Sequence, residues 1–529
     1  MTSRYAVYYA CIALSIATLL LALLHTPLWW IGFAAFAACS LLGTWDTIQS
    51  RHNLLRNYPV TGHLRWLAES IRPQIRQYFV ESDKEEAPFS RDERALVYQR
   101  AKNVNDARPF GTEMNVYAEG YEWINHSIAP HPEHEGDFRI TVGNGQCTKP
   151  YSASIFNISA MSFGALSANA IRALNLGAKL GHFAHDTGEG GLSTYHRENG
   201  GDLIWELGSG YFGCRQADGR FDPVKFRDMA QIDQVKMVEV KLSQGAKPGH
   251  GGVLPAAKVS AEISAARGVP MGQDCVSPSS HSAFSTPAGL LEFVQKLREL
   301  SGGKPTGFKL CIGHPVEFMA IVKAMLKTGI YPDFIVIDGA EGGTGAAPYE
   351  LTDRIGTPLR EGLIFARNVL VGAGVREQVR IGASGKIITG FALAACCALG
   401  ADWSNAARGF MFALGCIQAR KCHTNLCPTG ITTQDPRRQR ALVVPIKGQR
   451  VANYHRNTVK ALAEIVAAAG LDHPTDLTPA HLWLRTRLNT IQMAGQHYPF
   501  LKPRQLLEDA DTPLAAYWKA ADPGRFAIA

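Results

Sequence analysis

The sequence predicts an α/β protein centred on a (β/α)8 TIM barrel, with an N-terminal transmembrane helical hairpin and a helical C-terminal extension. Short apolar or β-branched runs alternate with longer helical patterns from residue 152 onward, as expected for repeated βα units around a parallel sheet. The 51 glycines supply the tight turns that such units need. Eight candidate strands match the number in the barrel. They are residues 154–159, 182–185, 237–242, 273–277, 307–312, 334–337, 379–383 and 402–406.

Composition limits the class of protein and its partners. A chain of 529 residues that is 46% hydrophobic and 19% charged can bury a large core and is not expected to be disordered. The formal net charge of +8 does not point to nucleic acid, because many arginines directly follow the apolar N-terminus. The eleven cysteines are an odd number and partly clustered, which argues against a disulfide framework and for a reducing compartment.

Two apolar runs at the N-terminus predict a membrane anchor. Residues 5–24 carry no charge and can cross a hydrocarbon core of about 30 Å as a helix, and residues 28–42 form a shorter second run. Arginines follow the second run and are absent from the turn, so the positive-inside rule places both termini in the cytoplasm. We expect the barrel on the cytoplasmic side of the inner membrane. A cleaved signal, a re-entrant hairpin and a buried soluble hairpin are the alternatives.

The changes of pattern along the chain predict four parts. Residues 1–45 form the transmembrane hairpin, and residues 46–139 form a polar, partly helical connecting segment. Residues 140–445 form the barrel, which includes a cysteine-rich segment at 415–433. Residues 446–529 form the helical extension, whose apolar stripe indicates packing rather than chemistry.

Glycine-rich loops follow the sixth and seventh predicted strands. In barrels, a phosphate is commonly held by the last βα loops, where backbone amides and a nearby cation face the anion. Two such loops in consecutive late units therefore predict a cofactor that carries a phosphate group. The residues expected around it are Gly342, Gly343, Thr344, Ser384, Gly385, Lys386 and Arg408.

Earlier strand ends carry groups that suit a flavin ring and an acidic substrate. Met161 and Ser162 lie in a run of small residues that allows close approach of a flat ring. Lys241 ends a strand, where a lysine can stabilise the negative charge of a reduced flavin; alone, it would more simply be a solvent-facing strand end. Donors for a dicarboxylate follow, and Glu189 can orient an amine or imine. These donors are Gln244, Lys247 and Arg267.

Three cysteines follow the eighth predicted strand at close spacing. Cys416, Cys422 and Cys427, the last followed by a proline, favour an iron-sulfur cluster. Zinc bound by three cysteines and His423 is the main alternative. Because His423 is adjacent to Cys422, binding of one ion by both is awkward.

Five motifs occur in the order found in one family. They are Met161 to Ser167, Thr187 to Gly191, Gln244 to Gly249, Gly342 to Ala346, and Gly415 to Thr433. On these motifs, residues 145–435 resemble the synthase domain of glutamate synthase, and the whole chain is more like the smaller glutamate-synthase-related proteins.

The resemblance implies FMN in the barrel and a [3Fe-4S] cluster on Cys416, Cys422 and Cys427. It also implies contact of Glu189, Gln244, Lys247 and Arg267 with 2-oxoglutarate, with Glu189 and Lys247 as the catalytic pair. The reaction would be reductive amination of 2-oxoglutarate or a related 2-oxo acid, in which hydride from reduced FMN converts an imine into the amino acid.

The sequence also departs from the large enzyme. We expect no glutaminase activity, and no nucleotide-binding unit for NAD(P)H is recognised, so an external electron carrier or a reductase subunit is implied. His250 stands where the family has an acidic residue, and the substrate can therefore differ. The loop 277–281 follows the family only in part and is given no catalytic role.

Two other functions compete with this one. The first is a membrane-bound dehydrogenase that oxidises an amino or hydroxy acid and passes electrons to quinone, which the apolar anchor favours. The second is a non-catalytic redox sensor or assembly partner that keeps the barrel.

Overall fold

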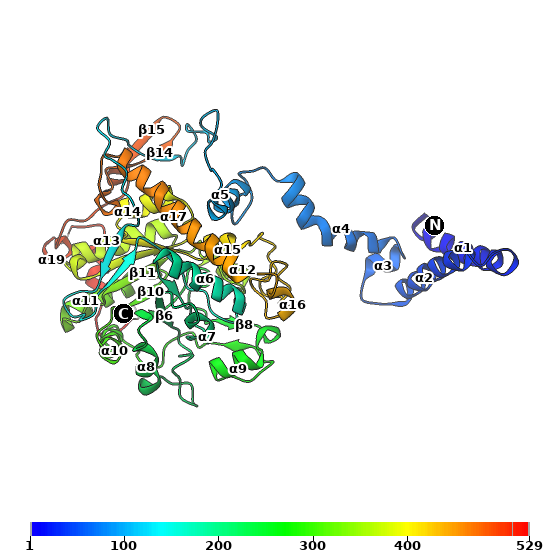
Figure 1. Ribbon diagram of the computed structural model, residues 1–529, viewed down its shortest axis with the longest axis horizontal. Coiled ribbons are helices and arrows are strands. Elements are labelled where there is room, and N and C mark those ends of the chain that lie inside the picture. The colour runs from blue at the N-terminus through cyan, green and yellow to red at the C-terminus, as the bar shows by residue number, and fades with distance from the viewer. Residues whose placement is uncertain (1–2, 510, 527–529) are drawn as a thin grey trace. The chain divides into compact units, whose positions relative to one another are not determined.

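The chain forms two compact units in the computed structural model, which describes residues 3–509 and 511–526. One unit comprises residues 1–93 and the other residues 94–529. The larger unit contains the barrel and its extensions (Figure 1).

The N-terminal unit begins with two helices of membrane-spanning length. After the short helix η1 (Ser3–Tyr5), helices α1 (Ala6–Leu24) and α2 (Trp29–Ile48) pack against one another as a hairpin. In the most apolar 18-residue stretch of each helix, only 11% is buried, so most of these apolar side chains are exposed. The unit continues with α3 (Asn53–Asn57), α4 (Gly62–Ile75) and the one-turn π-helix η2 (Arg76–Val80).

Eight parallel strands close into a barrel in the larger unit, which confirms the predicted fold class. The first strand pairs with both the second and the last, so the sheet has no free edge. The strands are β4 (Phe156–Ile158), β5 (His185–Asp186), β6 (Leu203–Leu207), β7 (Val235–Lys241), β10 (Thr306–Leu310), β11 (Phe334–Asp338), β12 (Arg380–Ser384) and β13 (Trp403–Ala406).

One of the eight predicted strands is wrong. Residues 273–277 contain β9 (Cys275–Val276), which pairs antiparallel with β8 (Val253–Leu254) outside the barrel. The strand missing from the prediction is β6. Its apolar run is interrupted by Glu206, which is only 2% exposed and lies against Lys309 inside the barrel. An acidic residue that is buried with its partner is thus the reason why the pattern failed.

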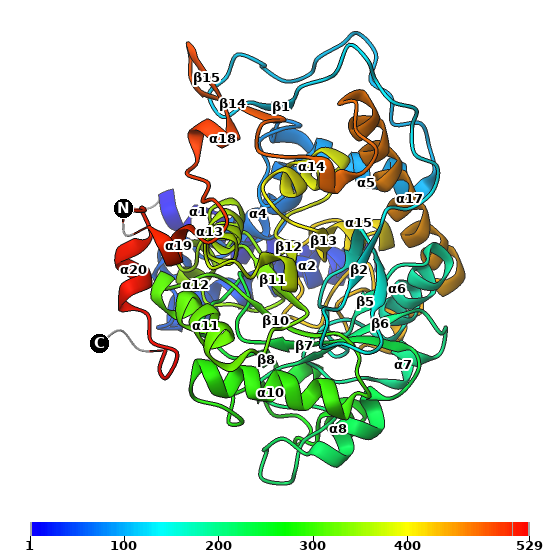
Figure 2. The ribbon, with the colours of Figure 1, turned by 90° about the vertical axis from the view of Figure 1, so that its left-hand side faces the viewer.

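Helices surround the strands (Figure 2). Several begin at a residue whose side chain accepts a backbone N–H, such as Ser167 before α6 and Thr389 before α14. The helices are α6 (Ala168–Gly181), α7 (Thr194–Arg197), α8 (Pro223–Ala230), α9 (Ala261–Arg267), α10 (Pro287–Leu300), α11 (Pro315–Thr328), α12 (Tyr349–Arg354), α13 (Leu359–Gly372), α14 (Gly390–Ala398) and α15 (Arg408–Leu414), with the 3-10 turns η3 (Ala256–Lys258) and η4 (Arg376–Gln378).

Segments before and after the barrel pack on its outside. The longest helix, α17 (Val444–Ala468), crosses α6 closely, because Gly177 leaves room for Val451 and Gly448 leaves room for Leu176. The extension also contains two strands, of which β14 pairs with β1 and β15 pairs with β14. The remaining elements are α5 (Arg91–Lys102), β1 (Glu122–Ile124), β2 (Arg139–Val142), β3 (Tyr151–Ser154), α16 (Pro436–Gln439), η5 (Pro474–Asp476), β14 (Leu482–Arg487), β15 (Thr490–Met493), α18 (Ala494–His497), α19 (Gln505–Glu508) and α20 (Ala515–Ala520).

Candidate functional site at the barrel mouth

The carboxyl ends of the barrel strands bring the predicted site residues to one face of the barrel. Met161 and Ser162 follow β4, and Glu189 follows β5. Lys241 ends β7, while the glycine-rich loops follow β11 and β12. Arg408 begins α15 directly after β13. This is the end of a barrel at which ligands bind.

A compact charged group forms around Glu189. Its Oε1 lies 3.1 Å from Nζ of Lys241, which also donates a 2.5 Å hydrogen bond to Oε1 of Gln244. Burial alone would raise the pKa of Glu189. Attraction by Lys241, with smaller contributions from Arg267 and Lys247, outweighs burial and lowers this pKa. The carboxylate is therefore held in its ionised form.

Two further cations of this group are buried. Lys247 is 2% exposed, and burial lowers the pKa of its ammonium although Glu189 opposes the shift. Arg267, at the end of α9, donates to the Phe163 carbonyl at 3.0 Å and to Oγ of Ser162 at 3.3 Å. Its Nε is buried and has no hydrogen-bond partner among the described residues. The group thus retains an unused donor.

Glycines fit closely around Glu189. A Cβ on Gly252 would lie 2.0 Å from Oε1 of Glu189, and a Cβ on Gly208 would lie 2.7 Å from Oε2. Gly188 has φ +65° and approaches the backbone N of Ser162, which a Cβ would meet at 2.6 Å. The carboxylate therefore has one place to lie, and the loops after β4 and β5 touch through main chain.

The loops after β7 and β11 are also in backbone contact. A Cβ on Gly245 would lie 1.6 Å from the Gly339 carbonyl oxygen, so only glycine fits there. The Gly245 N–H donates to Oδ2 of Asp338 at 2.7 Å. A Cβ on Gly342 would lie 3.5 Å from Cα of Gly245. The loop that carries Gln244 and Lys247 is thereby fixed to the first glycine-rich loop.

Arg408 contacts the first glycine-rich loop, which follows β11. Its guanidinium donates to the Glu341 carbonyl at 2.5 Å, and a Cβ on Gly343 would lie 2.8 Å from its Nε. Burial lowers the pKa of Arg408 to about 10 against the attraction of nearby acids. Gly343 and Thr344 are exposed, so their main chain remains open to a ligand.

The second glycine-rich loop has two consecutive residues with positive φ. Gly385 has φ +152° and Lys386 has φ +52°, directly after Ser384 at the end of β12. The Ser384 carbonyl accepts the Gly339 N–H at 2.8 Å, which joins the two glycine-rich loops. Oγ of Ser384 also lies 3.3 Å from Oγ of Ser159. Loops of this kind can turn successive N–H groups toward an anion.

The three clustered cysteines lie close enough to influence one another. Burial, with smaller contributions from the thiols of Cys422 and Cys427, raises the pKa of Cys416 to about 12. Burial would also raise the pKa of Cys427, but hydrogen bonds dominated by Thr429 and Thr432 lower it to about 7. A thiol that ionises near neutral pH is suited to bind a metal.

The cysteine segment contacts the loop after β4 and the loop after β11. A Cβ on Gly345 would lie 3.8 Å from Cβ of Cys422. Lys258 is 3% exposed and donates to the Cys422 carbonyl at 3.1 Å and to the Ala165 carbonyl at 2.7 Å. The segment is thus attached to the loops that follow β4 and β11.

His281 is a site residue that sequence reasoning missed. It lies in the loop 277–281, is 8% exposed, and its Nε2 lies 2.8 Å from the Lys241 carbonyl. Its Nδ1 lies 3.0 Å from the Tyr211 hydroxyl. Burial lowers the pKa of His281, so a neutral ring that donates from Nε2 fits both contacts. It positions the end of β7, and only its burial distinguishes it from a surface histidine.

A second charged group lies inside the barrel. Lys309 on β10 contacts Glu206 on β6, and its Nζ lies 3.1 Å from Oε1 of Glu239 on β7. One carboxylate oxygen from each of Asp186, Glu206 and Glu239 lies within 4.8 Å of the other two. Burial and then repulsion by Glu206 raise the pKa of Asp186 to about 7. Lys309 is thus the cation around which three carboxylates gather.

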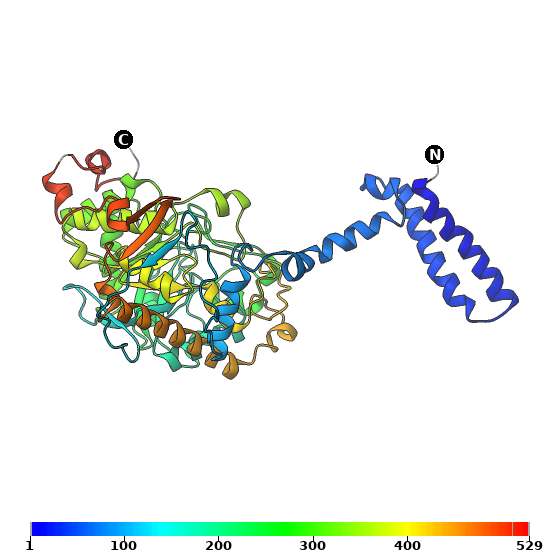
Figure 3. The same ribbon diagram turned by 90° about the horizontal axis from the view of Figure 1, so that it is seen from above.

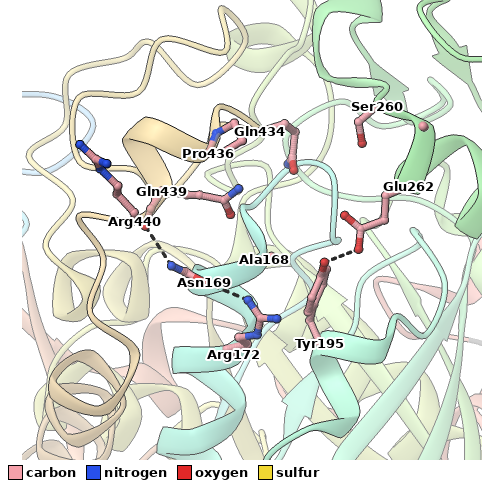
Figure 4. Close-up of a pocket in the computed structure, with 11 residues that line it drawn as sticks. Ala168, Asn169, Arg172, Tyr195, Ser260, Glu262, Gln434, Pro436, Gln439 and Arg440 are labelled. Atoms are coloured by element: carbon pink, nitrogen blue, oxygen red, sulfur yellow. Dashed lines mark hydrogen bonds between the residues drawn. The ribbon is translucent and has the colours of Figure 1, made fainter.

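The larger unit also has a cavity of about 460 Å³ (Figure 4). It is lined by α6, α7, α9 and the segment after the cysteines, and none of the predicted site residues lines it. Two of its charged lining residues are paired locally: Arg172 pairs with Glu198, and the Tyr195 hydroxyl donates to Glu262.

The fold is that of a (β/α)8 barrel protein, with a candidate ligand site at its strand ends. The chain belongs to the glutamate synthase family, since the conserved region in glutamate synthase matches residues 132–472, more than half of its length. The resemblance stated on the five motifs is thereby confirmed.

Two relatives named for glutamate synthase agree with this assignment. The glutamate synthase large subunit-like protein YerD of Bacillus subtilis is 40% identical over 481 residues, which cover 83% of this chain and 91% of that protein. An archaeal-type glutamate synthase [NADPH] of Thermotoga neapolitana is 34% identical over 315 residues, 59% of each chain. A solved structure of a mutant flavocytochrome b2 with pyruvate bound is 11% identical with a TM-score of 0.41, covering 85% of this chain and 90% of that one.

Replacing Lys309 by Met is expected to destabilise the barrel by about 3–5 kcal/mol, because three buried carboxylates lose their cation. The measurement is urea unfolding of the full chain in detergent, followed by the fluorescence of the buried Trp205 and Trp403. Lys327→Met, the same change at an exposed position of α11, should alter stability by less than about 0.5 kcal/mol. Equal stability of the two variants would contradict the structural role of Lys309.

Proposed function

We propose that the chain is a glutamate synthase-like oxidoreductase that uses FMN and a [3Fe-4S] cluster to aminate 2-oxoglutarate or a related 2-oxo acid. The observation that carries the proposal is the gathering of one carboxylate with buried cations at the mouth of the barrel. Glu189, Lys241, Gln244, Lys247 and Arg267 come from three separate loops or helices and meet there. Family membership supports the oxidoreductase class.

The residues of the mouth fit an FMN molecule. Gly343 offers exposed main chain beside the Arg408 side chain, which adds positive charge, and the turn at Gly385 and Lys386 has positive φ. These groups would hold the phosphate, with Gly342, Thr344 and Ser384 in the same loops. Met161, Ser162 and Lys241 would face the ring. When bound, FMN supplies the hydride of the reduction.

The buried cations fit a dicarboxylate substrate. Arg267 has an unused Nε donor, and Lys247 and Gln244 lie in the loop beyond Lys241. Arg267 and Gln244 would bind the carboxylates of the 2-oxo acid. Ammonia and the 2-oxo group would condense to an imine with release of water, and a hydride and a proton would complete the amine. Glu189 would orient the nitrogen, and Lys247, whose ammonium pKa is lowered by burial, would deliver the proton.

The cysteine segment fits a cluster held by three thiolates. Cys416, Cys422 and Cys427 influence one another electrostatically and adjoin the ligand loops. His423 is exposed, which favours the three-thiolate set over zinc bound as Cys₃His. The cluster would pass electrons to the flavin from an external carrier or a reductase subunit. The archaeal-type relative's name includes NADPH, and for this chain the donor is proposed only as such a partner.

The two N-terminal helices support a location at the membrane. Both are long and apolar enough to span a bilayer. We propose that they anchor the chain in the inner membrane with the barrel in the cytoplasm. The same helices favour a second candidate function, in which the barrel oxidises an amino or hydroxy acid and the electrons pass to quinone in the membrane.

Replacing Cys427 by Ser is expected to abolish the iron signal while FMN is retained, because the flavin loops do not depend on this thiol. Iron content, electron paramagnetic resonance and visible spectra of anaerobically purified protein measure both groups. Cys397→Ser, at a buried cysteine of α14 outside the segment, should keep the iron. Full iron in Cys427→Ser would remove the ligand assignment, and absence of both cofactors from the wild type would favour the non-catalytic alternative.

Chemically reduced protein is expected to convert 2-oxoglutarate and ammonium into glutamate. Arg267→Lys should raise KM for 2-oxoglutarate about 10- to 100-fold, because lysine lacks the Nε donor that Arg267 has free for the substrate. Arg227→Lys on the exposed face of α8 serves as the control. Absence of turnover with any 2-oxo acid would exclude amination, and bleaching of the oxidised flavin by an amino acid would favour the dehydrogenase.

Replacing Lys241 by Met is expected to move the acid limb of the pH profile of kcat/KM to higher pH. Lys241 is the strongest attractive partner of Glu189, so its removal raises the pKa of that carboxyl. Activity that needs ionised Glu189 then falls at a higher pH on acidification. Lys236→Met, at the other end of β7, should leave the limb in place. An unmoved limb in Lys241→Met would show that Glu189 does not set it.

A further inference from the structure

We infer that residues 62–80, comprising α4 and η2, form a second membrane contact that lies flat on an anionic bilayer surface. Their apolar stripe would enter the acyl region, and a row of arginines would meet the lipid phosphates. This inference rests on the proposed membrane anchor, and it assigns a lipid partner to a part of the chain outside the two spans.

The apolar stripe is regular and uncovered. Leu64, Leu67, Ile71 and Ile75 recur at helical spacing, so they share one face of α4. Their exposed fractions are 65%, 59%, 46% and 45%. The stripe continues into η2, where Phe79 is 85% exposed. A helix with so large an uncovered apolar face requires a partner, because apolar surface in water is unfavourable.

A row of arginines flanks the stripe. Arg65, Arg72 and Arg76 recur at spacings of seven and four residues, so they lie together along one edge of it. Residues 62–80 contain these three arginines against one acidic residue, Glu69, which is 3.7 Å from Arg72. An apolar face with arginines at its edge is the pattern of a helix that binds anionic lipid surfaces.

The start of α4 is fixed to the open end of the α1–α2 hairpin. Asp46, near the end of α2 and 0% exposed, accepts the Val60 N–H at 2.9 Å and lies 2.9 Å from Nε2 of His63. Just before α1, Arg4 of η1 donates to Oδ1 of Asn57 at 3.0 Å. Figure 3 shows α3 and the start of α4 at the end of the hairpin that carries the N-terminus.

This attachment places α4 at the boundary of the membrane. If the hairpin spans the bilayer, its open end lies where hydrocarbon gives way to headgroups. The segment 49–61 that connects α2 to α4 carries Arg51 and Arg56, so positive charge collects at that depth as well. The charge and the position of α4 both favour lipid over an apolar groove of another protein.

The test is site-specific photo-crosslinking of the full chain in vesicles of phosphatidylglycerol that contain a radiolabelled lipid. The photoreactive residue p-benzoylphenylalanine replaces Ile71 in the stripe, Glu69 on the opposite face, or Leu20 within α1. Label on the chain after irradiation is measured by gel electrophoresis. We expect several-fold more lipid label at Ile71 than at Glu69, with strong label at Leu20.

The three positions test the surface helix and the membrane anchor separately. Label at Leu20 without label at Ile71 would overturn the surface helix and leave the anchor intact. Absence of label at Leu20 would instead remove the anchor. Crosslinking of Ile71 to the barrel unit or to a second copy of the chain would also overturn the inference, because protein would then cover the stripe.

The arginine row is tested in the same vesicles. With p-benzoylphenylalanine at position 71, phosphatidylglycerol should yield several-fold more label than phosphatidylcholine. The triple replacement Arg65→Gln, Arg72→Gln and Arg76→Gln should abolish that difference between the two lipids. Arg91→Gln, an exposed arginine at the start of α5, is the matched control. A lipid preference that survives the triple replacement would contradict the role of the row.

Discussion

Closure of the eight-stranded sheet is the constraint on which the larger unit depends. Because β4 pairs with both β5 and β13, strand ends from residue 158 to residue 406 meet in one ring. Loops distant in sequence then touch through main chain, as Gly245 and Gly339 do. A candidate ligand site built from six loops needs this closure, since no single loop supplies all of its groups.

The barrel holds buried charged groups in its interior and at its mouth, and the ratio of cations to carboxylates differs between the two places. Inside the barrel, one cation, Lys309, is surrounded by three carboxylates, and the pKa of Asp186 is raised by burial and then by repulsion from Glu206. At the mouth, the cations Lys241, Arg267 and Lys247 surround the single carboxylate of Glu189, and their attraction lowers its pKa. The mouth therefore has spare positive charge, which is the sign that an acidic substrate requires.

The fold and much of the mouth could be predicted because their signals are local. Seven of the eight barrel strands have apolar runs, and the glycine loops at Gly342 and Gly385 lie directly behind strands. Strand β6 was not predicted because Glu206 is buried only through its contact with Lys309, 103 residues away in the sequence. His281 was not predicted as a site residue for the same reason, since its partner, the Lys241 carbonyl, is distant in the sequence. Pairings between distant segments leave no periodic pattern.

The cysteine segment illustrates how such distant pairings build a working unit. The side-chain amide of Gln434 donates to the carbonyls of Gly164 and Leu166 at 2.9 Å each, and Oγ of Ser167 donates to the Gly430 carbonyl at 2.8 Å. Lys258 joins the same two segments from a third direction. Moving either segment would leave buried polar groups unpaired, at about 1–3 kcal/mol each. The cysteines and the loop after β4 are therefore held in one arrangement.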